Sequence, residues 1–397
     1  MFALARASAS AAVAAPAAAR AAVRCISDAA LAQELTFPIT PFKCHLTDGP
    51  QVEEMTTTGA ELLEFFKLAV HYRRLELVAE SAYKQQLIRG FCHLHIGQEA
   101  IPIGMEAAIS KADSVITAYR CHTLLKARGA SDVEILAELL GREAGCSRGK
   151  GGSMHMYGPE FYGGNGIVGA QIPIGAGLAL AHKHANAKAA DDAKRIAVAL
   201  CGDGAVPQGQ VHEAFNMAAL WKLPVIFCVE DNQFGMGTSV SRSNANTEFY
   251  TIGHGVIPGV QVDAMDPLAV KAAFQWARQA TIDNGPTILQ LKTYRYRGHS
   301  MSDPGTSYRT RDEVKEVQKS RDVIEGIRAR VIDAGIADAA ELKAIEKDIR
   351  KTVEAALEEA KASSELPASE LITDIYVDKE SQKGFVRGVS LDKSWVL

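Results

Sequence analysis

Apolar positions recur at helical spacing in the first third of the chain. Over residues 61–88 they fall three or four positions apart, with charged residues between them: Leu62, Phe65, Phe66, Ala69, Tyr72 and Leu75. The pattern predicts a long amphipathic helix whose apolar stripe packs into the core. From Gly97 short helical patterns alternate with brief apolar runs such as 114–118, and the glycine-dense stretch 141–169 predicts a loop.

The middle of the chain alternates strand and helix. Residues 196–201 and 224–229 are short continuous apolar runs, typical of buried strands, and 208–220 between them has helical spacing, so a βαβ unit is predicted. The alternation continues through a helix, a strand and two helical segments, expected at 267–282, 287–291, about 313–334 and 339–362. We predict an α/β fold, with a mostly parallel sheet covered by helices on both faces and extra N- and C-terminal helices.

The N-terminus has the composition of a targeting segment. Residues 1–27 carry Arg6, Arg20 and Arg24, and no acidic residue precedes Asp28. This pattern is typical of a mitochondrial transit peptide and predicts a mitochondrial matrix protein, with a chloroplast address and a disordered alanine-rich tail as alternatives. The expected division is a transit peptide at 1–27, an N-terminal extension at 28–60, one binding domain at 61–362 and a tail at 363–397.

Charge and hydropathy argue against several classes of protein. The formal charge of −4 becomes −7 without the three N-terminal arginines, so a nucleic-acid partner is not expected. The longest weakly polar run, 167–181, has 15 residues and contains Gln171 and Pro173, so no membrane span is expected. The seven cysteines include no Cys-x-x-Cys pair, so neither a zinc site nor a disulfide framework is indicated.

Polar residues follow the two apolar runs of the predicted βαβ unit. Gly202-Asp203-Gly204 comes directly after the first run, and Glu230-Asp231-Asn232 comes after the second. Because ligands bind beyond the carboxyl ends of parallel strands, Asp203 and Asn232 are expected to converge. A carboxylate and an amide oxygen suit Mg²⁺, and the glycines let a phosphate approach the backbone. The pattern therefore predicts a magnesium diphosphate site.

Several longer strings carry a family resemblance. The Gly-Asp-Gly motif with Asn232 at that spacing resembles the diphosphate-magnesium motif of thiamine diphosphate enzymes. Four further strings resemble those of the pyruvate dehydrogenase alpha-subunit family: GKGGSMH at 149–155, GGNGIVGAQ at 163–171, NMAALW at 216–221 and YRYRGHSMSDP at 294–304. The resemblance runs from about Leu35 to the C-terminus. It implies the thiamine diphosphate-binding fold and thiamine diphosphate- and Mg²⁺-dependent oxidative decarboxylation of pyruvate.

The resemblance also implies roles for individual residues. Magnesium would be bound by Asp203, Asn232 and the backbone carbonyl of Phe234, where the family usually has tyrosine. Cofactor contacts would come from Tyr119, Arg120, Gly158, Gly166, Val168, Asp203, Gly204, Ala205, Asn232 and His299. His93 and His299 match the catalytic histidines of the family, which can steer or protonate a reacting oxygen. Arg297 stands where the family commonly has histidine, which affects the expected hydrogen bonding around His299.

The resemblance further implies partners and regulation. The family takes its proton-donating glutamate from a beta subunit, and the chain shows no pyrimidine-binding segment, so half of an active site in an α2β2 assembly is expected. The acetyl group would pass to the lipoyl group of a dihydrolipoyl acetyltransferase. Ser300, Ser307 and Ser239 match phosphorylation sites of a dedicated kinase, which a phosphatase would reverse; phosphate at Ser300 would repel the diphosphate and act as an off switch.

Other interpretations of the motifs remain open at this point. Gly164–Gly169 fits the G-x-G-x-x-G dinucleotide fingerprint of an NAD-dependent oxidoreductase, with Asp191 and Asp192 about 20 residues beyond, but no apolar strand precedes it. A nucleotide P-loop at Gly149-Lys150 fails on spacing. A non-catalytic paralogue is the second rival. Branched-chain 2-oxo acid and acetoin dehydrogenase alpha subunits are close relatives, although the string around His299 resembles the pyruvate form.

Overall fold

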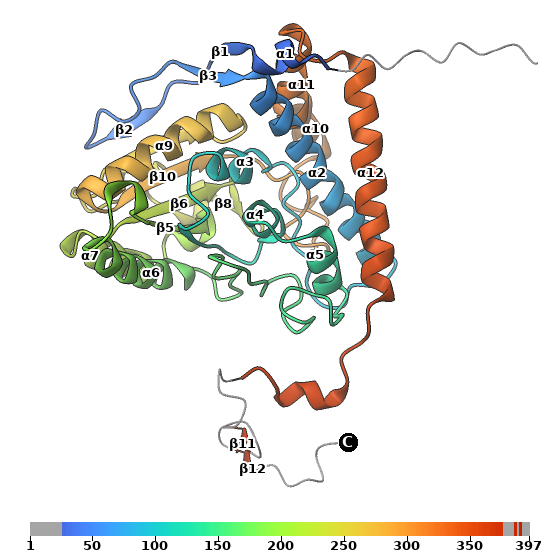
Figure 1. Ribbon diagram of the computed structural model, residues 1–397. Coiled ribbons are helices and arrows are strands. Elements are labelled where there is room, and N and C mark those ends of the chain that lie inside the picture. The colour runs from blue at the N-terminus through green and yellow to red at the C-terminus, as the bar shows by residue number, and fades with distance from the viewer. Residues whose placement is uncertain (1–25, 376–384, 387–388, 391–397) are drawn as a thin grey trace, which may run out of the picture.

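A six-stranded sheet forms the centre of the computed structural model, which describes residues 26–375, 385–386 and 389–390 (Figure 1). Five strands are parallel: β4 (Ser114–Ile116), β5 (Ala197–Gly202), β6 (Val225–Asp231), β9 (Gly259–Asp263) and β10 (Thr287–Lys292). A sixth, β2 (Lys43–His45), pairs antiparallel with β9, and the order across the sheet is β2-β9-β10-β6-β5-β4. The predicted fold class is confirmed.

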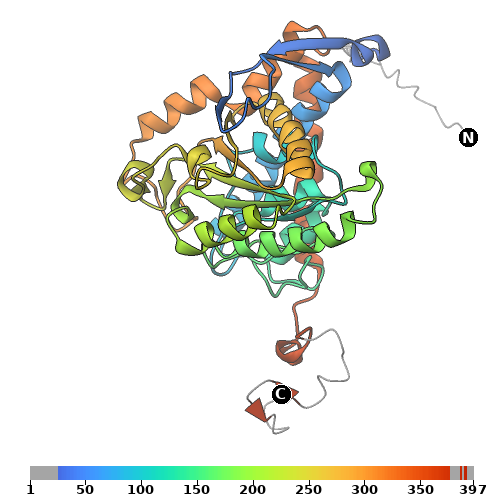
Figure 2. The same cartoon turned by 90° about the vertical axis from the view of Figure 1, so that its left-hand side faces the viewer.

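Helices cover both faces of this sheet (Figures 1 and 2). One face packs against α6 (Gln171–Asn186) and α7 (Gly209–Leu220), and the other against α3 (Ala100–Glu106), α9 (Pro267–Asn284) and the long helix α2 (Gly59–Lys84). Successive residues of β6 belong to the two cores in turn: Val225, Phe227 and Val229 to one, Ile226 and Cys228 to the other. A strand buried on both faces needs apolar side chains at every position, which explains the continuous runs in the sequence.

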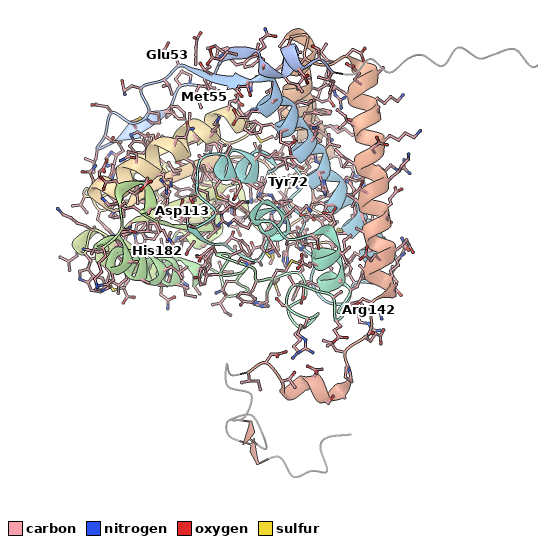
Figure 3. The ribbon with its side chains drawn as sticks, in the orientation of Figure 1. Glu53, Met55, Tyr72, Asp113, Arg142 and His182 are labelled. Atoms are coloured by element: carbon pink, nitrogen blue, oxygen red, sulfur yellow. The ribbon has the colours of Figure 1, made fainter. Side chains whose placement is uncertain are left out.

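The predicted elements around the sheet are largely present. The βαβ unit is β5, α7 and β6, and the next predicted helix and strand are α9 and β10. The long N-terminal helix is α2, with Tyr72 buried in the core (Figure 3). The helix α12 (Ala339–Ala362) begins and ends at the predicted residues. Its start is fixed by a capping box formed by Asp338 and Glu341. In Figure 1 it runs alongside α2, close to α5 (Asp132–Leu139).

The single helical segment predicted at 313–334 is wrong in one respect. The structure has two helices there, α10 (Arg311–Arg321) and α11 (Val323–Asp333). Asp322 between them has an extended backbone, and its side chain accepts hydrogen bonds from the N–H groups of Ile324 and Glu325. An N-cap of this kind starts a new helix and interrupts the preceding one.

Shorter elements complete the description. The N-terminal extension contains α1 (Asp28–Ala32) and an antiparallel pair, β1 (Glu34–Pro38) with β3 (Glu54–Thr58). The remaining helices and strands are α4 (His122–Arg128), β7 (Phe234–Gly235), β8 (Thr238–Ser239), α8 (Val240–Ser243), β11 (Phe385–Val386) and β12 (Val389–Ser390), with 3₁₀ turns η1 (Asp191–Ala193), η2 (Asp203–Ala205), η3 (Phe249–Thr251) and η4 (Ala368–Ile372). No helix in the described ranges is long and apolar enough to cross a bilayer. Residues 1–25 of the expected transit peptide and much of the 363–397 tail lie outside the described residues.

Candidate active site

Asp203 and Asn232 lie at the same edge of the sheet. β5 and β6 are parallel neighbours with Gly202 opposite Glu230, so Asp203 and Asn232 follow the carboxyl ends of adjacent strands. The turn η2 contacts β7, and a Cβ on Gly204 would lie 3.0 Å from the Cα of Gly235. Only glycine allows this approach, which brings the backbone after Asp203 against the segment that carries Asn232 and Phe234.

The carboxylate of Asp203 is buried and incompletely paired. The residue is 2% exposed, and its Oδ2 has no hydrogen-bond partner. Burial raises the pKa of Asp203 to about 7 and the charge of Asp231 adds to the shift, although the Gly204 N–H, Arg295 and the Gln233 N–H oppose it. A buried carboxylate oxygen without a partner is costly unless a cation or donor satisfies it. The position therefore suits a bound cation.

The neighbouring oxygens fit a hard metal ion. The Asn232 amide donates from Nδ2 to Oε1 of Gln98 at 3.0 Å, which fixes the amide orientation and leaves Oδ1 on the opposite side, 3.4 Å from the Phe234 nitrogen. Asp231 is already paired, since Lys292 Nζ lies 2.8 Å from its Oδ2. Within the described residues no group of three or more His, Cys, Asp or Glu side chains is placed to hold a metal. One carboxylate with an amide oxygen fits Mg²⁺, which keeps water and phosphate as its other ligands.

Three rings line one wall of the site. The centroid of His93 lies 4.5 Å from that of Tyr119 and 5.3 Å from that of His299, and Tyr119 and His299 are also 5.3 Å apart. Burial, then the charge of Arg120, lowers the pKa of His93 to about 2, and the same two causes lower the pKa of His299 to about 4. Both imidazoles are therefore neutral at physiological pH in the absence of an anion, and each can donate or accept a hydrogen bond.

Arg120, Arg295 and Arg309 are buried and donate to backbone carbonyls, and the charges of Arg120 and Arg295 act on both histidines. Arg120 binds the carbonyls of Leu94 and His299, at 2.5 and 2.9 Å. Arg295 reaches Phe234, Met236 and Arg297 carbonyls and Tyr308, and Arg309 reaches the Arg295 and Arg297 carbonyls. In the described part of the chain none of the three forms an ion pair with a carboxylate, so the wall carries excess positive charge suited to an anion.

Sequence reasoning identified Arg120 and missed Arg295 and Arg309. The alternating arginines of 294–312 were the available signal, because a strand precedes that loop. Arg297 behaves differently from its neighbours: its Nε donates to Oε2 of Glu80 on α2 at 2.8 Å and it is 40% exposed. It therefore points away from His299, whose N–H donates to Asp303 at 2.6 Å.

The glycine-dense segment is a loop, as predicted. Its proposed cofactor residues differ in whether they lie near Asp203. Gln208 at the start of α7 donates to the Val168 carbonyl at 3.0 Å, so Val168 lies near the turn that follows Asp203. Gly166 faces the ring of His155, to which a Cβ would approach within 3.3 Å. Gly158 forms a turn with Phe161, and its contacts are with Phe161 and Leu125. None of these contacts joins it to the turn that follows Asp203.

The backbone of 147–152 is occupied by an internal carboxylate. Glu138 of α5 is fully buried, and its Oε2 accepts the N–H groups of Ser147 and Gly149 at 2.8 Å each. Its Oε1 accepts those of Gly151 and Gly152, at 2.6 and 3.1 Å. These N–H groups are therefore unavailable to a nucleotide phosphate, which removes the P-loop interpretation.

The dinucleotide fingerprint also lacks its structural context. Helix α6 follows Gly164–Gly169, but the residues before this stretch make only isolated bridges between Val115 and Phe161 and between Gly158 and Phe161. The motif requires a strand, a tight turn and a helix in succession. Asp191 and Asp192 lie in the exposed turn η1.

The three candidate phosphorylation serines differ in environment. Ser300 is 8% exposed, and its Oγ lies 2.9 Å from Oγ of Ser302. Ser307 is exposed, and Ser239 is half-buried with its Oγ 3.3 Å from that of Ser241. Ser300 is the most buried of the three.

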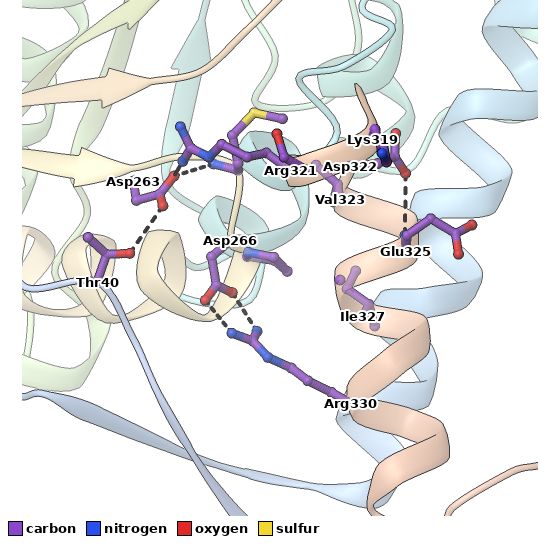
Figure 4. Close-up of a pocket in the computed structure, with 14 residues that line it drawn as sticks. Thr40, Asp263, Asp266, Lys319, Arg321, Asp322, Val323, Glu325, Ile327 and Arg330 are labelled. Carbon is purple, nitrogen blue, oxygen red and sulfur yellow. Dashed lines mark hydrogen bonds and ion pairs between the residues drawn. The ribbon is translucent and has the colours of Figure 1, made fainter. Parts of the chain in front are cut away.

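A separate cavity lies away from this sheet edge, between the β9–α9 turn and the start of α11 (Figure 4). Its volume is about 450 Å³, and most of its charged lining residues are paired with other side chains. Arg330 makes two bonds to Asp266, at 2.7 and 2.6 Å, while Arg321 binds Asp263, which also accepts from Thr40. These contacts join the helices to the sheet and leave little charge for a ligand.

Comparison with known proteins gives a consistent result. A family model described as "Dehydrogenase E1 component" matches residues 67–369. The mitochondrial pyruvate dehydrogenase E1 component subunit alpha-1 of Oryza sativa is 51% identical, over 92% of this chain and 90% of the relative. The Saccharomyces cerevisiae mitochondrial alpha subunit is 49% identical, over 91% and 85% respectively. A Caenorhabditis elegans relative named as a probable mitochondrial alpha subunit is 49% identical, over 91% and 89%.

Proposed function

This chain belongs to the dehydrogenase E1 component family, and we propose that it is the alpha subunit of a mitochondrial pyruvate dehydrogenase that holds the magnesium diphosphate end of thiamine diphosphate. The observation that carries the proposal is the buried Asp203 carboxylate, which has an unpartnered oxygen at the ligand edge of the sheet. Asn232 and the Phe234 carbonyl would complete the protein ligands of Mg²⁺, and Gly204 and Ala205 would offer backbone contacts to the diphosphate.

The other site residues have separable tasks. When bound, thiamine diphosphate supplies the electron sink that lets a 2-oxo acid lose CO₂. Arg120 with Tyr119 would bind the phosphate end, and Gly166 and Val168 would approach the aminopyrimidine ring through their backbones. His93 and His299 are neutral and adjacent, so each can donate a hydrogen bond to the substrate oxygen through its ring N–H.

A beta subunit would supply the rest of the active site. Val168, assigned to the aminopyrimidine, is 48% exposed and its neighbour Ile167 is 70% exposed, and Tyr157 and Tyr162 of the same loop are also exposed. Contiguous exposed apolar side chains mark interaction surfaces, so this loop is expected to be covered in an α2β2 assembly. The acetyl group formed from pyruvate would then pass to the lipoyl group of the acetyltransferase partner.

Phosphorylation at Ser300 would switch the enzyme off. The phosphate adds a charge of about −1.5 to −2 to a buried hydroxyl, where it would break the contact with Ser302 and compete for Arg309 and Arg295. Those arginines hold the loop through backbone carbonyls, so their diversion would disorder the site wall. Ser307 and Ser239 would be further targets of the same kinase, and a phosphatase would reverse the switch.

The proposal is tested by assembly and activity. The purified chain with thiamine diphosphate and Mg²⁺ should release no CO₂ from pyruvate alone, and should release it when the beta subunit is added. The assembled enzyme should prefer pyruvate to branched-chain 2-oxo acids and to acetoin, in line with the names of the relatives. Turnover by the chain alone, or an assembled enzyme that does not use pyruvate, would overturn the proposal.

A further inference from the structure

A buried polar chain lies behind the wall of three rings. It runs from Glu76 on α2 through His122 at the start of α4 to Ser153 in the glycine-dense loop, and all three are at most 4% exposed. Glu76 Oε2 lies 2.9 Å from His122 Nδ1, and His122 Nε2 lies 2.9 Å from Ser153 Oγ. Ser153 Oγ then accepts the backbone N–H of His93 at 3.1 Å.

The donors and acceptors of this chain fix its direction. A carboxylate oxygen accepts, so the contact with Glu76 places a proton on Nδ1 of His122. The Ser153 hydroxyl oxygen accepts the N–H of His93 and shares a hydrogen bond with Nε2 of His122. Glu76 Oε1 also accepts the backbone N–H of His95 at 2.9 Å. The Glu76 carboxylate therefore holds the backbone at both His93, through His122 and Ser153, and His95, directly.

The order Glu, His and Ser is that of a hydrolytic triad, but the geometry does not support attack by the serine. Ser153 is buried, and its oxygen is engaged by two partners, His122 and the His93 N–H. A nucleophile must present its oxygen to a substrate with an oxyanion site close by. The hydrogen-bonded set of Glu76, His122 and Ser153 therefore has a structural role within the protein.

His93 depends on backbone support because few hydrogen bonds hold its ring. Its Nδ1 is buried without a hydrogen-bond partner, and the ring is otherwise placed by contacts with the rings of Tyr119, His299 and Phe91. We propose that Glu76, His122 and Ser153 are positioning residues that hold His93 in its catalytic orientation through its backbone. This inference rests on the proposed function, in which the His93 ring acts on the substrate oxygen.

The test is a double-substitution cycle in the enzyme assembled with its beta subunit. Ser153→Ala should lower kcat by about tenfold to a hundredfold, the loss that a small misplacement of a catalytic group causes. The KM for pyruvate and the affinity for thiamine diphosphate should change less than about threefold, since Glu76, His122 and Ser153 are buried and none of them is assigned a ligand contact. In a His93→Ala background, where no ring remains to be placed, Ser153→Ala should have almost no further effect on kcat.

Two further variants guard against a loss of folding. Glu76→Gln keeps the side-chain shape but turns a donor toward His122, which reverses the bonds without removing them, so a smaller kcat loss than for Ser153→Ala is expected. Ser114→Ala is the matched control, because Ser114 Oγ makes a buried contact of 2.7 Å to His182 on α6, outside the hydrogen-bonded set of Glu76, His122 and Ser153. It should lower the melting temperature to a similar degree while its effect on kcat stays small.

The outcomes separate the inference from the function beneath it. Losses from Ser153→Ala and His93→Ala that simply multiply would overturn the positioning role, as would a kcat loss in Ser114→Ala equal to that in Ser153→Ala. An assembled His93→Ala enzyme with unchanged kcat would instead overturn the catalytic role of His93. The inference is supported if Ser153→Ala keeps less than about a tenth of the wild-type kcat and causes no further loss of kcat in the His93→Ala background.

Discussion

Replacing Glu138 with glutamine should loosen the loop that carries Ser153. The wild-type carboxylate accepts four backbone N–H groups, two on each oxygen. Glutamine presents one oxygen and one NH₂ group, so two of these donors would face another donor. Hydrogen bonds to a charged group contribute about 1.5–3 kcal/mol each, so the loss of two is expected to cost about 3–6 kcal/mol, less whatever the loop recovers from water.

The assay combines thermal unfolding with limited trypsin digestion. Arg148 and Lys150 lie in the loop and are tied to the C-terminal segment by ion pairs with Asp374, at 2.7 Å each. Glu138→Gln should lower the melting temperature and speed cleavage after these two residues. Glu134→Gln on the same helix is the control, because Glu134 is exposed and only completes the capping box with Ser131. Equal cleavage rates and equal melting temperatures for Glu138→Gln and wild type would refute the reasoning.

Two further predictions concern charge. Full phosphorylation of Ser300 in the assembled enzyme should abolish turnover, because the phosphate would break the contact with Ser302 and place negative charge beside the arginines of the site wall; undiminished activity at full phosphate incorporation would contradict this. Burial would raise the pKa of Asp132, but His71 and Lys126 hold it below its ordinary value. That contribution is present above the unfolded-state pKa and is lost as pH falls through the folded one, which lies below 3.8, so Asp132→Asn should lower the melting temperature at pH 7 and lower it by much less at about pH 3. An equal gap at both pH values would count against it.

The sequence predicts the centre of the site better than its walls. Asp203 and Asn232 follow continuous apolar runs one βαβ unit apart, and the rule for parallel sheets is enough to bring them to one edge. Strand β9 was missed because it is five residues long and Gln261 interrupts its apolar pattern. The edge strand β2, three residues long, gave no periodic signal at all.

The buried polar residues could not be inferred from local patterns. Arg295 is buried where the carbonyls of the distant residues Phe234 and Met236 meet it. Arg309 is buried against the carbonyls of Arg295 and Arg297 in its own loop, and a sequence shows both only as loop arginines. Glu76 lies on the helix predicted at 61–88, yet its partner His122 is 46 positions away. Long-range contacts of this kind depend on packing between elements, which periodicity does not encode.

The central claim is tested most directly by titrating thiamine diphosphate, at saturating Mg²⁺, into assembled enzyme that carries Asp203→Ala. The account predicts binding at least about a hundredfold weaker than wild type, because the site loses its only carboxylate for the metal. Asp231→Asn, one strand away and already paired with Lys292, is the matched control and should bind the cofactor nearly as well as wild type. Unchanged affinity in Asp203→Ala would contradict the placement of the magnesium diphosphate site.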